Sequence, residues 1–159
     1  MNKNSKKPVL LYLFVLFFVA STSVLPGIIQ QEIKVAEPYE YTRVYTDAKG
    51  ESHFEDVKIP FKLADFAPPA PPISVTGAIN TEAFVLISSP SGWFGNWHPS
   101  PARQYIIMIS GELKVEVSDG EIRRFEQGDI VLVEDTTGKG HISRVVSEKR
   151  AFCLVLTLK

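Results

Sequence analysis

A short stretch rich in aromatic residues and proline holds one of the three histidines of this chain. Residues 95–105 read GNWHPSPARQY, so that His98 lies between a tryptophan and two prolines, and Gln104 opens the apolar run that follows. Imidazole nitrogen is a ligand for zinc, copper, iron and nickel, and it also serves as a general acid or base near neutral pH. The stretch is therefore either part of a metal or ligand site or a loop shaped by its prolines.

Few other side chains in the chain offer comparable chemistry. His141 follows the loop sequence VEDTTGKG, which contains Glu134 and Asp135, and His53 lies in the segment ESHF. We expect both loop acids to be solvated, because acidic side chains in loops are mostly exposed, and a proton-transfer role near the mouth of a barrel is the alternative. Cys153 is the single cysteine and lies in the apolar run AFCLVLTL, which predicts a buried, unreactive thiol and no internal disulfide.

Short apolar or alternating segments, separated by turn residues, must position these side chains. They follow one another at intervals of roughly 8 to 12 residues, the spacing of all-β sandwiches and barrels. The expected strands between residues 83 and 158 are AFVLISS, QYIIMIS, LKVEV, EIRRF, IVLVE, HISRVV and AFCLVLTL. If Gln104 points inward, strand alternation turns Ile106 and Met108 inward as well.

The sequence before residue 83 divides into two parts. Residues 1–30 combine three lysines, a twelve-residue apolar run and small residues, the layout of a signal peptide, and the apolar stretch of residues 9–29 also suits a retained membrane anchor. Residues 31–82 contain two strand-like segments around the turn Asp47–Gly50 and then two pairs of prolines, which predicts a β-hairpin and a proline-rich arm. We therefore expect export to the periplasm or the extracellular space.

The composition is that of one globular domain. The chain has 159 residues, of which 45% are hydrophobic and 22% charged, close to the averages of soluble domains, and we find no internal repeat. Three of the 17 basic residues and none of the 18 acidic residues lie in residues 1–30, so that the rest of the chain carries a formal charge of −4. An acidic surface without a basic patch argues against nucleic-acid binding.

The spacing around His98 resembles the first motif of the cupin superfamily, whose members are small double-stranded β-helix barrels. That motif, G-x5-H-x-H-x3-E-x6-G, aligns without a gap from Gly92 to Gly111. His98 stands on the first histidine, Ser100 on the second and Gln104 on the glutamate. The spacing is therefore kept while two of the three ligand positions have changed.

The second cupin motif, G-x5-P-x-G-x2-H-x3-N, is matched more loosely. It opens at Gly128, Glu134 replaces the proline, and His141 arrives two residues late. The resemblance covers roughly residues 83–158. It implies an all-β fold with a single cupin (jelly-roll) barrel over residues 83–159, preceded by the N-terminal hairpin and proline-rich arm and by the hydrophobic export or anchor segment.

Typical cupins hold one divalent ion through two histidines, a glutamate and a later histidine. The resemblance implies a divalent transition metal (iron, manganese, nickel, copper or zinc) held here by His98, Gln104 and His141. This neutral set should bind metal more weakly than one with an anionic glutamate. The inward side chains should surround a mostly apolar cavity, the usual form of a small-molecule site. Further expected lining residues are His53, Trp93, Trp97, Ser100 and Met108.

Two function classes follow from this reading. The first is a metal-dependent cupin enzyme that acts on a small organic molecule as an oxygenase, isomerase or lyase. The second is a non-catalytic cupin that binds a small ligand without metal, and a β-sandwich without a cavity is a third alternative. The cupin habit of pairing barrels suggests a homodimer, in which His53 either packs on the hairpin surface or caps the pocket of the second subunit.

Overall fold

The computed structural model describes residues 33–159, which form one compact unit. Every regular element in this part of the chain is a β-strand, so the all-β prediction is confirmed. No helix long and apolar enough to cross a membrane occurs among these residues. The predicted export or anchor segment, residues 1–30, lies outside the described residues and stays a prediction.

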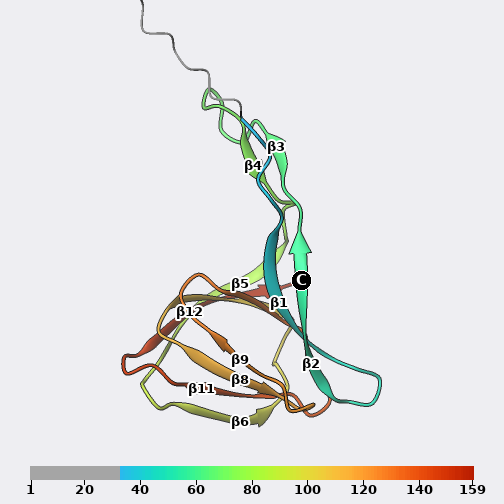
Figure 1. Cartoon of the computed structure of the whole chain (residues 1–159), viewed down its shortest axis with the longest axis vertical. Helices are drawn as coiled ribbons and strands as arrows, with labels where there is room; N and C mark the ends of the chain where they lie inside the picture. Colours follow the sequence, from blue (N-terminus) through green and yellow to red (C-terminus); the bar gives the residue numbers. More distant parts are fainter. Residues whose placement is uncertain (1–32) are drawn as a thin grey trace, which may run out of the picture. The chain divides into compact units, whose positions relative to one another are not determined.

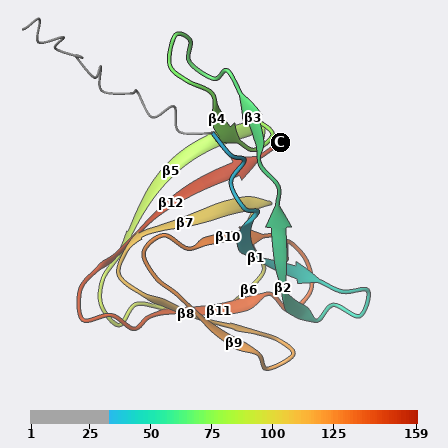
Figure 2. The ribbon, with the colours of Figure 1, turned by 45° about the horizontal axis from the view of Figure 1, so that its top comes forward.

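Two antiparallel-rich sheets face each other and form the barrel (Figure 1). The larger sheet contains, in spatial order, β2 (Ser52–Ile59), β1 (Tyr39–Thr46), β10 (Ile130–Val133), β7 (Gln104–Ser110), β12 (Ala151–Leu158) and β5 (Thr81–Ser89). The smaller sheet contains β6 (Phe94–His98), β11 (His141–Val145), β8 (Leu113–Val117) and β9 (Ile122–Phe125). Figure 2 shows β5, β12, β7 and β10 side by side above the strands of the smaller sheet.

The N-terminal hairpin is built into the larger sheet. Strands β1 and β2 pair along their whole length, and the turn between them is closed by Asp47, whose carboxylate accepts hydrogen bonds from the amides of Lys49 and Glu51 at 2.8 and 3.0 Å. Strand β1 also runs parallel to β10, with Val44 beside Val133. The hairpin predicted around residues 47–50 therefore exists, and it is continuous with the barrel sheet.

The proline pairs lie between two very short strands. Strands β3 (Lys62–Ala64) and β4 (Ile73–Val75) form a separate two-stranded sheet, and the residues between them contain the turn and the prolines. Proline lacks the amide proton that a continuous ladder needs, so Pro71 and Pro72 prevent β4 from extending toward its N-terminal side. In the sequence this small sheet separates the hairpin from β5.

The core lies between the two barrel sheets. Its buried side chains come from both, among them Val44 and Met108 of the larger sheet and Val117 and Phe125 of the smaller one. Met108 is only 2% exposed, so the alternation predicted for β7 holds at this residue. The opposite face of β7 carries Tyr105 and Ile107, which line a groove on the outside of the larger sheet.

Seven of the strands match the segments expected between residues 83 and 158, but one strand was not expected. Residues 94–98 form β6, which pairs with β11 at the edge of the smaller sheet. Glycine, asparagine and the following prolines made this stretch look like a loop. The stretch can form a strand because it lies at the edge of the sheet. An edge strand needs hydrogen bonds on one side only and tolerates prolines at its end.

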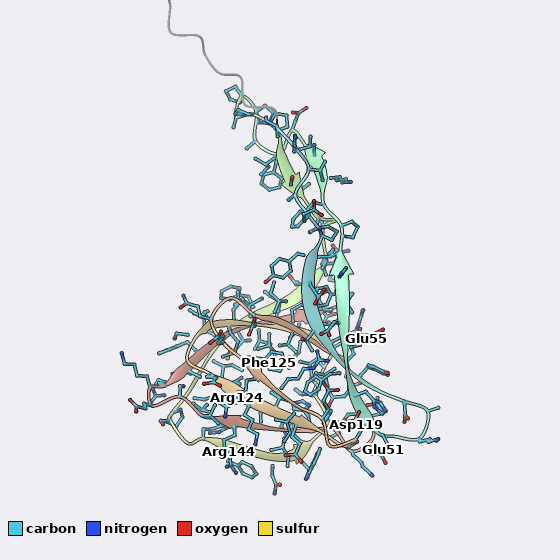
Figure 3. All side chains as sticks on the ribbon, viewed as in Figure 1. Glu51, Glu55, Asp119, Arg124, Phe125 and Arg144 are labelled. Carbon is cyan, nitrogen blue, oxygen red and sulfur yellow. The ribbon has the colours of Figure 1, made fainter. Side chains whose placement is uncertain are left out.

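The buried aromatic pair between β2 and β9 provides a test of the core. The ring of Phe125 is 4% exposed and lies 6.0 Å from the ring of Phe54 (Figure 3 labels Phe125). We expect Phe125→Ala to lower the free energy of unfolding by about 3 to 5 kcal/mol, measured by urea denaturation. Ile122→Ala, on the same strand at a side chain that is 46% exposed, should change it by less than about 1 kcal/mol. Equal effects would contradict this assignment of the core.

Candidate functional site

A cavity of about 250 Å³ lies between the two barrel sheets. Most of its wall is apolar, with Ile106 and Val155 from the larger sheet and Leu113 from the smaller one among the lining residues. The polar side chains on the wall are Ser89, His98, Ser100, Gln104, His141 and Ser143. An apolar cavity with a few converging polar groups is the usual form of a small-molecule site. All three predicted ligand residues thus reach one cavity.

Strand pairing brings His98 and His141 together. The two residues are direct partners in the β6–β11 ladder, and their ring centroids lie 4.9 Å apart. The backbone at Gly140 lies very close to the backbone of His98. A Cβ atom added to Gly140 would be only 2.0 Å from the carbonyl oxygen of His98. Gly140 has a φ of 71°, which only glycine adopts readily. A glycine is therefore required beside the histidine pair.

Both histidines have their Nδ1 atoms fixed by protein acceptors. His98 Nδ1 lies 2.6 Å from the backbone oxygen of Asn96, and His141 Nδ1 lies 2.6 Å from Oδ2 of Asp135. Because a carbonyl oxygen and a carboxylate only accept hydrogen bonds, each Nδ1 carries the proton. In the neutral rings the Nε2 atoms then keep their lone pairs, and no protein partner is found for them among residues 33–159. This is the tautomer that a metal or a donor group of a ligand requires.

Asp135 lies in a different environment from the one that the sequence predicts for it. The expectation of a solvated loop acid is wrong: the residue is 0% exposed, and Oδ1 has no hydrogen-bond partner within the described chain. The backbone oxygen of Asp135 accepts a hydrogen bond from the Ser100 amide at 3.0 Å. Asp135 therefore connects the residues ahead of β7 with His141, and it orients the imidazole as a carboxylate behind a metal-binding histidine does.

Gln104 is oriented by Ser100. The amide nitrogen of Gln104 donates to Ser100 Oγ at 3.3 Å, and the Ser100 hydroxyl donates to the Ala102 carbonyl at 2.7 Å. Ser100 is 3% exposed, and its hydroxyl is engaged by these two protein groups. The amide oxygen of Gln104 is left as the acceptor on the cavity wall.

The remaining predicted pocket residues separate into two groups. Trp93 lines the cavity, and its indole lies over Gly95, where a Cβ atom would come within 2.7 Å of the ring. Trp97 is 44% exposed and is not part of the wall, and Met108 lies in the core, where its sulfur is 3.4 Å from the Cys153 thiol. Burial raises the pKa of the Cys153 thiol, which agrees with the unreactive cysteine that the sequence indicates.

The structure places His53 at the hairpin, outside this cavity. Its Nδ1 lies 2.6 Å from Asp119 in the β8–β9 turn, and its Nε2 lies 3.3 Å from Asp47. The side chains of Glu51 and Asp119 lie at this same end of the barrel (Figure 3). The hydrogen bond with Asp119, and less so the one with Asp47, raises the pKa of His53 against the opposing effect of burial. His53 thus fastens the hairpin to the smaller sheet.

Glu134 also differs from the expected solvated loop acid. Its carboxylate forms ion pairs with Arg103 and with Arg43, the latter at 2.5 Å, and the side chain is 13% exposed. Burial alone would raise its pKa, but the two arginines outweigh that effect and hold the pKa of Glu134 below its usual value. Glu134 therefore joins β1 to the start of β7, and it does not line the cavity.

The donor set fits a divalent transition metal of the kind that accepts imidazole and neutral oxygen ligands. It consists of two imidazole nitrogens and one amide oxygen, with a carboxylate behind one imidazole. Among residues 33–159 no group of three or more histidine, cysteine, aspartate or glutamate side chains is arranged to hold a metal ion. A metal in this cavity would therefore depend on Gln104 for its third protein ligand.

Comparisons with solved structures find similar folds at low sequence identity. A cupin 2 conserved barrel domain protein from Salinispora arenicola has 16% identity and a TM-score of 0.41 over 64% of this chain and 76% of that one. The Schizosaccharomyces pombe Cnp3 cupin domain has 10% identity and a TM-score of 0.41, covering 78% and 86%. A conserved Streptococcus pyogenes protein of unknown function has 14% identity and a TM-score of 0.40, covering 81% and 82%.

No protein-family model and no curated protein sequence matches this chain. The likeness to solved structures therefore concerns the fold alone. The facing sheets, the cavity between them and the ladder that joins the two histidines agree with the cupin resemblance of the sequence.

The buried carboxylate of Asp135 generates a stability prediction. We expect Asp135→Ala to lower the free energy of unfolding by about 3 kcal/mol, because the change leaves the buried His141 Nδ1 proton without its acceptor. Asp65→Ala, at an exposed aspartate, should have an effect below about 0.5 kcal/mol. Urea denaturation of both variants measures the difference. A value for Asp135→Ala as small as that of the control would show that the hydrogen bond is not structural.

The contact of His53 with Asp119 generates a pH prediction. Because folding raises the pKa of His53, its contribution to stability is fully present below about pH 6.5 and is lost as the pH rises through the folded-state pKa. The pKa of Asp119 is lowered, first by the hydrogen bond from the Glu121 amide, so its contribution is lost only in acid. The stability cost of His53→Ala should therefore be larger at pH 5.5 than at pH 8.5 in urea denaturation. In a chain that carries Asp119→Asn, the cost of His53→Ala should differ much less between the two pH values. An equal cost at both pH values in the unaltered background would refute the proposed contact between His53 and Asp119.

Proposed function

We propose that this chain binds a divalent transition metal ion and a small organic ligand in the cavity of its barrel. The metal would be held by Nε2 of His98, Nε2 of His141 and the amide oxygen of Gln104. The observation that carries the proposal is the histidine pair, with ring centroids 4.9 Å apart and both Nδ1 atoms fixed by acceptors 2.6 Å away. Such fixed, complementary tautomers are typical of metal-binding histidines.

The charge of the site favours an anionic ligand. The three donors are neutral, and the one nearby carboxylate, Asp135, lies behind His141 instead of in the cavity. A bound divalent ion would therefore keep most of its positive charge toward the cavity, where it would attract a carboxylate or an enolate oxygen. When bound, such an ion acts as a Lewis acid that polarises a substrate oxygen.

The apolar wall supplies the second part of the proposed function. Ile87, Ile106 and Val155 of the larger sheet line the cavity together with the three polar donors, and Trp93 forms a further part of its wall. These side chains would bind the hydrocarbon part of a ligand and exclude water from its polar end, which strengthens electrostatic interactions there. The cavity volume of about 250 Å³ suits a compound of modest size.

The reaction class remains that of a metal-dependent oxygenase, isomerase or lyase acting on a small organic molecule, and a metal-free barrel that binds a small ligand is the competing function. The free Nε2 atoms of His98 and His141 support metal binding, and in a metal-free barrel the same lone pairs would accept a hydrogen bond from a ligand hydroxyl. We also propose that the chain works outside the cytoplasm, in the periplasm or the extracellular space, because the sequence of residues 1–30 predicts an export or anchor segment.

Metal binding tests the proposal directly. The full-length chain, purified in detergent without chelator or nickel affinity, should bind about one Co²⁺ per chain, measured by visible absorption, and Zn²⁺ should displace it. His98→Ala and His141→Ala should each weaken the affinity by at least about 100-fold, since each removes a ligand. Gln104→Glu should strengthen the affinity by about tenfold or more, because it supplies an anionic oxygen.

His53→Ala is the matched control, since His53 lies on the hairpin and does not line the cavity. It should leave the Co²⁺ affinity unchanged. If the unaltered chain binds no Co²⁺ or Zn²⁺, or if His98→Ala binds as well as His53→Ala, the metal proposal fails. The metal-free ligand-binding function would then stand in its place.

A further inference from the structure

Within residues 33–159, strand β5 forms an edge of the larger sheet. It pairs with β12 on one side, and no backbone hydrogen bond from residues 33–159 reaches its other side. Residues 81–88 are all exposed, and Figure 2 shows β5 at the margin of the sheet, beyond β12 and β7. A long edge strand is normally protected by lysine, proline or shortness. Strand β5 is nine residues long, and its sequence TEAFVLISS contains neither lysine nor proline.

Both faces of this edge are apolar. Phe84 and Leu86, which are 65% and 62% exposed, lie on the outer face of the sheet, and Val85 and Ile87, at 48% and 43%, lie on the inner face. A terminal strand in water should be polar on at least one face. Large exposed apolar side chains on both faces of an edge strand mark an interaction surface.

We propose that β5 pairs antiparallel with β5 of a second copy of this chain, so that the two larger sheets become one continuous sheet around a two-fold axis. Such an axis is perpendicular to the sheet and keeps each side chain on its own face. Directly opposite residues of an antiparallel pair have their side chains on the same face of the sheet. The axis must therefore pass midway between the two copies of one residue, so that this residue lies opposite itself. The residue at the axis can be Phe84, Val85 or Leu86, which lie at the centre of the strand.

Two charged side chains select the register. Arg150 Nη1 donates to Ser88 Oγ at 3.0 Å, and no ion pair with an acid is found for Arg150 within the described residues. Glu82 has no ion-pair partner within these residues either, and the shift in the β5–β12 pairing leaves it without a residue opposite on β12. With the axis at Val85, Glu82 comes opposite the partner's Ser88 and hence beside the partner's Arg150.

The same register pairs the apolar residues well. Phe84 lies opposite the partner's Leu86, an aromatic–aliphatic cross-strand pair that occurs twice by symmetry, and Val85 lies opposite the partner's Val85. Axes at the neighbouring residues would instead place Glu82 opposite the partner's Leu86 or beyond the end of the partner strand. Of the three registers, only the one with Val85 at the axis pairs opposite charges with each other and also pairs apolar residues with each other.

The pairing has a consequence for the cavity. Ile87 belongs to its wall, and in the proposed register Ile87 lies next to the partner's Ala83 on the inner face. The second copy would thus extend the apolar wall on the β5 side of the site. The pairing itself does not depend on whether the cavity holds a metal.

Disulfide cross-linking tests the register in the full-length chain. Val85→Cys should form a cross-linked dimer under a mild oxidant, because its Cβ atom would lie roughly 4.5 to 5.5 Å from that of the same residue in the partner. Leu86→Cys, one residue along, faces the partner's Phe84 and should cross-link at least about tenfold less. The unaltered chain, whose Cys153 is buried, should not cross-link. Absence of the Val85→Cys dimer, or equal cross-linking of Leu86→Cys, would overturn the register.

Charge reversal tests the association without altering buried residues. In analytical ultracentrifugation of the full-length chain in detergent, Glu82→Arg and Arg150→Glu should each weaken the dimer by at least about tenfold, because each places like charges together across the seam. The double variant, with Glu82→Arg and Arg150→Glu, should recover most of the affinity. A chain that is monomeric at all concentrations, or a double variant no tighter than the single ones, would overturn the proposed dimer.

Discussion

The buried hydrogen bond between Asp135 Oδ2 and His141 Nδ1 is the interaction on which the site depends. The two atoms are 2.6 Å apart, and the residues are 0% and 7% exposed, respectively. Removing a carboxylate from water is costly unless its partner is held in good geometry, so the surrounding backbone has to be fixed. The carbonyl of Asp135 accepts the Ser100 amide, and Gly140 allows the backbone of His98 to approach closely. The loop of residues 134–140 thus sets the positions of both histidines.

The negative charge of the site lies on Asp135, behind His141, and not on the cavity wall. Where the cupin motif has a glutamate, Gln104 presents a neutral amide held by Ser100, and the carboxylate of Asp135 acts through His141. A metal in such a site would keep more of its positive charge for the ligand than one bound directly to an acid. A ligand in this cavity would be selected mainly by its shape and apolar area, because most of the wall is apolar and offers few hydrogen bonds.

Much of the barrel could be read from the sequence, because period-two alternation and glycine-containing turns are local signals. The strand QYIIMIS occupies Gln104–Ser110, as expected. His98 and Gln104, which the motif spacing identified as site residues, both line the cavity. The burial of Asp135 could not be read, since it is produced by Ser100 and His141, which approach only in the folded chain. Strand β6 was missed because its pairing with β11 comes from tertiary structure and overrides the turn-forming residues around it.

The most direct test of the site is the tautomeric state of the two histidines, observed by long-range ¹H–¹⁵N correlation NMR on the ¹⁵N-labelled full-length chain. The structure predicts that His98 and His141 both carry their proton on Nδ1 in the neutral form and that added Zn²⁺ shifts the Nε2 resonance of each, while His53 does not respond. A proton on Nε2 of either ring, or Nε2 resonances that Zn²⁺ leaves unchanged, would contradict the account.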